Sequence, residues 1–183
     1  DVVYYVPNRH TEGYGLSYEA IDKLSMMGVK LIITVDNGIS AVEEAKYINE
    51  LEMELIVTDH HLPSDTLPQA VAVIDPHRED CNLEFKDYAG VGVAYKLICA
   101  LEGEENGVTD SFADLVTIGT VADVMPLIKE NRELVRRGVQ LIADSDRMGI
   151  QSLIEAAGLS ERRMTSTTVA FGICPRHAAA RAV

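Results

Sequence analysis

The first half of the chain alternates short apolar runs with segments that carry apolar residues at helical spacing. Four apolar runs predict buried strands, at residues 2–7, 30–36, 54–59 and 70–75. Two segments between them predict helices, at residues 18–27 and 41–50. Ser17 and Ser40 are the expected N-caps, and Gly28 is the expected end of the first helix. Because the strands are apolar along their whole length, the pattern predicts a parallel sheet covered by helices on both faces.

After Gly90 the pattern changes to helical periodicity. Four segments repeat apolar positions with a period of about 3.6 residues, at residues 90–103, 110–125, 131–145 and 149–158. The expected fold class is therefore α/β, with a mainly parallel β-sheet flanked by helices and followed by a helical segment. We expect one domain over residues 1–160, with residues 161–183 starting a linker or a connection to a second domain.

Composition and charge narrow the possible functions. The chain has 183 residues, of which 47% are hydrophobic, enough for a substantial core. A net charge of −13 argues against a broad nucleic-acid-binding surface, but it leaves room for a metal site or for local basic contacts. We expect no membrane association, because no apolar run approaches the roughly 20 residues of a spanning helix, and the lack of a disulfide framework favours a cytoplasmic location. The three cysteines are too far apart for a disulfide framework or a zinc pair.

Three predicted strands end on an acid, namely Asp36, Asp59 and Asp75. Carboxyl ends of neighbouring parallel strands lie about 4.8 Å apart at one edge of a sheet. Carboxylates there repel one another unless a cation lies between them, so a divalent metal bridged by Asp36 is one interpretation. His60 is placed to add an imidazole nitrogen, whereas His61 is expected to point elsewhere because successive side chains diverge in extended backbone. The other interpretation is that each acid is a turn or cap residue.

A mixed carboxylate and imidazole set suits manganese, iron or zinc better than calcium. A further acid, Asp123, lies in the apolar stretch "GTVADVM". A buried carboxylate there needs a partner or a metal, and the alternative is an acid at the end of a helix that faces solvent. Gly119 would allow this helix to approach the site closely.

Several motifs together resemble the DHH phosphoesterase superfamily. The motifs are "VPNRHTEGYGLS", "TVDNGIS", "VTDHHLP", "VIDPHR", "AGVGVAYKL" and "GTVADVMPL". Their order and spacing are most similar to those of the family's single-strand-specific 5′→3′ DNA exonucleases, over residues 1 to about 175. The resemblance implies a DHH-type catalytic lobe and hydrolysis of phosphodiester bonds with two divalent metals, usually Mn²⁺ (or Mg²⁺).

The resemblance also implies roles for individual residues. Asp36 would bridge the two metals, and His60 and Asp123 would complete the shell of one of them. Asp59 would hydrogen-bond the imidazoles and orient them. Substrate phosphates would be contacted by three residues: Arg9, His61 and Arg176. Single-stranded DNA is the expected partner, with a single-strand-binding protein and a helicase as further expected partners in DNA repair and recombination.

The chain departs from the family pattern at both ends. The opening Asp-x-Asp-x-Asp-Gly motif, which supplies further metal ligands in the family, is absent. We therefore expect an N-terminally truncated catalytic core that is inactive by itself. The tail "GICPRHAAARAV" matches the family stretch only in part. Two other functions stay open: a DHH-family phosphoesterase acting on short oligonucleotides or cyclic dinucleotides, and a catalytically incomplete binding module.

Overall fold

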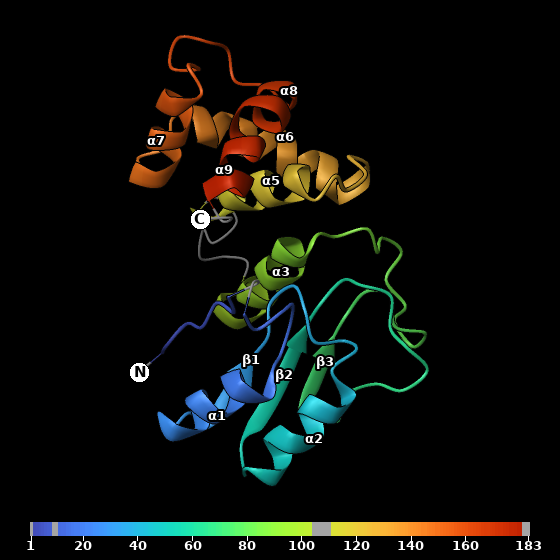
Figure 1. Cartoon of the computed structure of the whole chain (residues 1–183). Helices are drawn as coiled ribbons and strands as arrows, with labels where there is room; N and C mark the ends of the chain where they lie inside the picture. The colour runs from blue at the N-terminus through green and yellow to red at the C-terminus, as the bar shows by residue number, and fades with distance from the viewer. Residues whose placement is uncertain (1, 9–10, 104–110, 181–183) are drawn as a thin grey trace. The chain divides into compact units, whose positions relative to one another are not determined.

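The structure is a computed structural model, and it describes residues 2–8, 11–103 and 111–180. The chain divides into two compact units, residues 1–84 and 85–183. Unit 1 holds the sheet and two helices, and unit 2 is helical. Each unit is described by itself (Figure 1).

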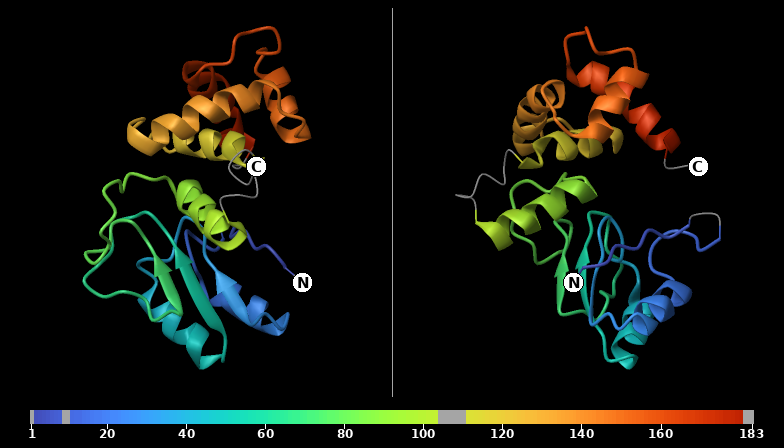
Figure 2. Two further views of the ribbon diagram at one scale, coloured as in Figure 1. Left: turned by 180° about the vertical axis from the view of Figure 1, so that it is seen from behind. Right: turned by 90° about the vertical axis from the view of Figure 1, so that its left-hand side faces the viewer.

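Unit 1 is built on a parallel sheet of three strands. The strands are β1 (Leu31–Ile33), β2 (Glu54–Thr58) and β3 (Ala72–Ile74), and they lie in the order β1-β2-β3. Both strand pairs are parallel, and β2 lies between β1 and β3 (Figure 1; the same sheet is seen from behind in the left view of Figure 2). The predicted α/β class with a parallel sheet is confirmed.

Helices α1 (Tyr18–Met26) and α2 (Val42–Glu50) pack on one face of this sheet. The buried cluster between them and the strands consists of Ile21, Leu24, Ile32, Ala45, Ile48, Met53, Leu55 and Val57. Leu31 and Ile33, whose side chains alternate with that of Ile32 along β1, are 41% and 46% exposed. Helices on both faces of the sheet stay a prediction.

The expected ends of α1 are confirmed, whereas the expected N-cap of α2 is not. The Ser17 side chain accepts a hydrogen bond from the Ala20 amide and caps α1, as predicted. Gly28 takes a φ of +79° just after the helix, which suits a residue without a Cβ. Ser40 does not cap α2, because Ala41 occupies that position and makes no side-chain bond.

The strand predicted at residues 2–7 is also absent from the described sheet. Val2, Tyr4 and Val6 are largely exposed instead. An apolar run becomes a strand only when its backbone groups pair with a neighbour, and within the described residues this run has no such ladder. Composition alone therefore did not decide this element.

Unit 2 is a helical cluster, which confirms the helical segment predicted after Gly90. The helices are α3 (Gly90–Glu102), α5 (Ala113–Ala122), α6 (Lys129–Ala143), α7 (Met148–Ala156), α8 (Ser166–Thr168), the π-helix η2 (Val169–Ile173) and α9 (Cys174–Ala180). Val169, Ile173 and Cys174 are buried with residues of α5, α6 and α7. The domain boundary near residue 160 stays a prediction. Among the described residues, no helix is long and apolar enough to cross a membrane.

Two glycines let the helices of unit 2 approach one another closely. A Cβ at Gly138 of α6 would lie 2.0 Å from Thr117 Oγ1 and 2.2 Å from the Ala113 carbonyl oxygen of α5. A Cβ at Gly119 of α5 would lie 2.5 Å from Val91 Cγ1 of α3. Gly119 thus serves the packing of α5 against α3, a role that the sequence did not predict.

Candidate metal centre at the ends of the strands

Polar residues gather where the parallel strands end. Beyond β1 the pairing continues, because the Asp36 amide donates to the Thr58 carbonyl oxygen at 3.1 Å. The Asp59 amide donates to the Ile74 carbonyl oxygen at 3.0 Å. These bonds hold the residues that follow β1 and β2 at one edge of the sheet, as the parallel topology requires.

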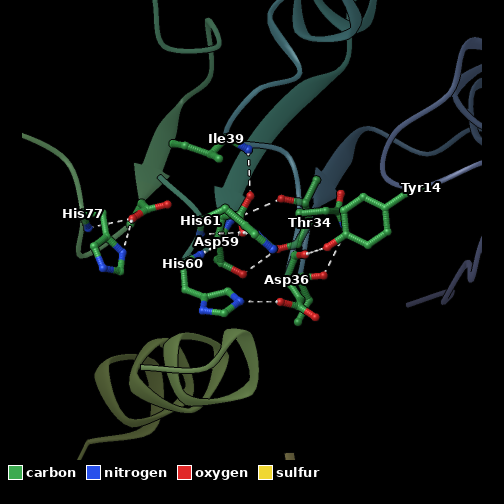
Figure 3. Close-up of polar contacts among 12 residues, drawn as sticks. Tyr14, Thr34, Asp36, Ile39, Asp59, His60, His61 and His77 are labelled. Atoms are coloured by element: carbon green, nitrogen blue, oxygen red, sulfur yellow. Dashed lines mark hydrogen bonds and ion pairs between the residues drawn. The ribbon is translucent and has the colours of Figure 1, made fainter. Parts of the chain in front are cut away.

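Asp36, His60 and His61 form one cluster at this edge (Figure 3). Each offers one potential ligand atom, and these atoms lie within 4.8 Å of one another. His60 Nε2 lies 3.0 Å from Asp36 Oδ1. The His60 side chain is only 9% exposed, whereas that of Asp36 is 50% exposed. One ligand is therefore fixed by burial, and the other is open to solvent.

The backbone of Asp36 is strained, with a φ of +65° in the left-handed region. Non-glycine residues rarely take this conformation, which costs on the order of 1–3 kcal/mol and recurs at functional sites. The Tyr14 hydroxyl donates to the Asp36 carbonyl oxygen at 2.5 Å and supports the turn. The Tyr14 ring also meets the His61 ring edge-on, with centroids 6.2 Å apart. Tyr14 was not singled out from the sequence, although it lies between two glycines of the motif "VPNRHTEGYGLS".

Asp59 is the buried centre of the hydrogen bonds at this edge. Its Oδ2 accepts from the Ile39 amide at 2.9 Å, and its Oδ1 accepts from the His60 amide at 2.8 Å. His61 Nδ1 lies 2.7 Å from the same Oδ1. Burial opposes ionisation of Asp59, but these hydrogen bonds outweigh it and hold the pKa of the carboxyl below its usual value.

His61 does not point away from His60, so that part of the prediction is wrong. The two ring centroids are 4.5 Å apart. The prediction assumed an extended chain, but β2 ends at Thr58, and the chain bends where Asp59 accepts from the amides that follow it. Because Asp59 is ionised, Nδ1 of His61 must be the donor in the bond between them. In the neutral ring, Nε2 then keeps its lone pair for a metal or a donor.

Asp75 follows β3 but lies outside this cluster of three. It is 4% exposed, and its Oδ1 accepts from the His77 amide at 2.7 Å. Its Oδ2 has no hydrogen-bond partner among the described residues. Burial, with the Asp59 charge added, raises the pKa of Asp75. The third strand end thus carries a carboxyl whose ionisation is opposed rather than assisted.

The other predicted residues lie elsewhere. Asp123, in unit 2, follows the last residue of α5 and is exposed, so the solvent-facing alternative describes its environment. Arg176 donates through Nε to the Ala156 carbonyl oxygen and through Nη1 to that of Gly172. Arg9 falls outside the described residues. A ligand role for Asp123 and phosphate contacts by Arg9 and Arg176 stay predictions.

The donors of the cluster fit a divalent transition metal. A carboxylate oxygen and imidazole nitrogens are ligands that manganese, iron and zinc accept, whereas calcium prefers oxygen alone. The three donors already lie close together. Asp59 accepts a hydrogen bond from the His61 ring, as outer hydrogen-bond partners do with the histidine ligands of metal sites. Three donors leave room for ligands from outside the cluster.

Comparison with known proteins gives consistent matches. The model of the "DHH family, N-terminal domain" matches residues 1–120. The single-stranded-DNA-specific exonuclease RecJ of Bacillus subtilis is 42% identical over 175 residues, which cover 96% of this chain and 22% of that protein. The Escherichia coli enzyme of the same name is 43% identical over 189 residues, which cover 96% of this chain and 33% of that protein.

A solved structure is also similar. The crystal structure of exonuclease RecJ bound to manganese matches with a TM-score of 0.84 at 36% identity, and the match covers 97% of this chain and 44% of that chain. The chain spans a third or less of the length of the two curated relatives.

Proposed function

The chain belongs to the DHH family, and from this premise we propose that it forms part of the catalytic core of a 5′→3′ exonuclease specific for single-stranded DNA. The observation that carries the proposal is the cluster of Asp36, His60 and His61 at the strand ends. Its residue types and positions agree with metal-assisted hydrolysis of phosphodiesters.

Asp36 and His60 would hold a divalent metal, Mn²⁺ or Mg²⁺, together with Asp123, and Asp36 would be shared between two such ions. When bound, the metals would lower the pKa of an attacking water and neutralise charge on the phosphate oxygens. Asp36 is half-exposed, so substrate can reach it, whereas the buried His60 anchors the site to the sheet.

His61 would contact the substrate phosphate. Its side chain is 49% exposed, and Asp59 fixes the ring from the opposite side. With Nδ1 donating to Asp59, a neutral ring presents Nε2 as an acceptor, and a protonated ring presents a second donor toward the phosphate. Asp59 therefore selects which nitrogen faces the substrate. Arg9 and Arg176 would add charge-assisted hydrogen bonds to phosphates.

The cellular setting belongs to the same proposal. A cytoplasmic enzyme of this kind would act in DNA repair and recombination, and a helicase and a single-strand-binding protein would supply and protect its substrate. These partners are proposed from the family resemblance.

The test uses the full-length enzyme of which this chain would be the core, and it measures manganese-dependent release of nucleotides from a 5′-phosphorylated single strand, with a duplex and a cyclic dinucleotide as controls. We expect Asp36→Asn to abolish release, because an amide is a poor metal ligand. The matched control Asp65→Asn, which changes an exposed acid of the same unit, is expected to leave release unchanged. Equal hydrolysis of the cyclic dinucleotide would favour another phosphoesterase of the family. Metal binding without turnover on any substrate would favour a binding module.

A further inference from the structure

Unit 2 contains an open groove of about 1040 Å³ between α3 and α6. Five cationic side chains line it: Lys96, Lys129, Arg132, Arg136 and Arg137. Glu130 and Glu133 are the acids of the lining. The groove belongs wholly to unit 2, and no residue of the candidate metal centre takes part in it.

The sign of the charge sets this groove apart from the rest of the molecule. Cations outnumber acids five to two in its lining, whereas the whole chain has 16 Lys and Arg against 29 Asp and Glu. A concave surface of one sign concentrates its field and attracts ligands of the opposite sign. The groove therefore favours an anionic ligand despite the net charge of −13.

The spacing of the cations favours an extended anion. Lys129, Arg132 and Arg136 follow one another at i, i+3 and i+7, so they lie along one face of α6. At about 1.5 Å per residue, this row extends for roughly 10 Å along the helix axis. One phosphate cannot reach all three side chains, whereas successive phosphates of one strand can.

Two ion pairs lie inside the groove. Lys96 Nζ lies 2.5 Å from Glu130 Oε2, and Arg136 Nη2 lies 2.9 Å from Glu133 Oε2. All four side chains are about half-exposed or more. Exposed pairs of this kind contribute only about 0–1 kcal/mol, so a polyanion can replace the two glutamates at little cost.

We propose that the groove between α3 and α6 binds the phosphate backbone of single-stranded DNA, as a second nucleic-acid contact separate from the candidate metal centre. Three of the five cations are arginines, whose planar guanidinium matches two phosphate oxygens at once. The choice of single-stranded DNA over an acidic peptide rests on the proposed function. The groove supplies the local basic contacts that an acidic chain needs to hold DNA.

The experiment measures binding of a fluorescein-labelled oligothymidylate by anisotropy, with EDTA present so that no hydrolysis occurs. Arg132→Gln with Arg136→Gln removes two groove cations, and Arg162→Gln with Arg163→Gln removes two exposed cations outside the groove. We expect the groove variant to bind on the order of tenfold more weakly at low salt and to lose about 1.4 from the slope of log K against log salt. The control variant is expected to stay within twofold, and Glu133→Gln should bind more tightly.

The outcomes separate this inference from the proposed function. Equal losses of affinity in the two double variants would show that net charge alone explains the effect, and they would overturn the proposal that the groove binds DNA. Unchanged binding in the groove variant, or a loss confined to binding of a polyglutamate peptide, would overturn it as well. Nucleotide release in manganese is measured separately on the full-length enzyme, so a missing hydrolytic activity there alongside intact groove-dependent binding would refute the proposed function alone. Circular dichroism checks that every variant is folded.

Discussion

Replacing Asp59 by Asn perturbs the hydrogen bonds that organise the metal centre and leaves the side-chain size unchanged. The buried carboxylate accepts from the Ile39 amide through one oxygen, and from the His60 amide and the His61 ring through the other. An Asn that keeps its oxygen toward His60 must turn its NH₂ group toward the Ile39 N–H. Two donors then face each other where an acceptor was.

The magnitude follows from burial. Ile39 is 1% exposed and Asp59 is also 1% exposed, so water cannot replace the lost acceptor. A hydrogen bond to a charged group contributes about 1.5–3 kcal/mol, and an unpaired buried donor costs about 1–3 kcal/mol. Relief from burying a charge offsets part of this loss. We expect Asp59→Asn to lower the free energy of unfolding by about 2–4 kcal/mol, whereas Asp65→Asn should change it by less than about 0.5 kcal/mol.

Urea unfolding in EDTA measures this loss, and its pH dependence tests the cause. Because the pKa of Asp59 is lowered in the folded state, its contribution is fully present above the unfolded pKa of about 3.9. It is lost as the pH falls through the lower folded pKa. The difference between wild type and variant should therefore be equal at pH 7 and pH 5 and shrink only below about pH 4. A loss under about 0.5 kcal/mol at pH 7, or a difference that already shrinks between pH 7 and pH 5, refutes the reasoning.

Three further predictions concern packing, charge and support of the site. Gly138→Ala forces a Cβ against α5 and should lower the free energy of unfolding in urea by about 1–3 kcal/mol or more. Gly149→Ala places a Cβ in open space on α7 and should raise the free energy of unfolding by up to about 1 kcal/mol. Equal effects of the two would contradict the close crossing. Asp75→Asn should raise the free energy of unfolding by about 1 kcal/mol in EDTA at pH 7, because the raised pKa of Asp75 means that its ionised form destabilises the folded state above the unfolded pKa. This gain should vanish as the pH falls below about 3.9. A loss of stability at pH 7 would show that the charge of Asp75 is compensated in the folded protein. Tyr14→Phe removes the hydroxyl that donates to the Asp36 carbonyl oxygen, and it should weaken manganese binding, measured by calorimetry, roughly threefold to tenfold. The control Tyr4→Phe changes an exposed tyrosine and should leave manganese affinity unchanged. Equal affinities of the two variants would exclude this role of Tyr14.

Much of the fold and part of the site could be predicted from the sequence. Contiguous apolar runs identified β1, β2 and β3, and the alternation with helices implied parallel pairing. Parallel pairing puts the carboxyl ends at one edge, so Asp36 and the Asp-His-His run had to lie near each other. The strand predicted at residues 2–7 failed because pairing requires a neighbour that composition does not supply.

The sequence by itself determined which residue types lie at the strand ends, because an acid directly follows each of the apolar runs that contain β1, β2 and β3. Only the tertiary structure decided how those residues face one another. The left-handed turn at Asp36 is held by bonds with Tyr14 and Thr58, and the buried Asp59 carboxylate is held by the Ile39 amide, so both depend on hydrogen bonds between segments far apart in the chain. A pattern that describes one segment at a time carries no information about such bonds, since their energy depends on the partner that the fold brings into range.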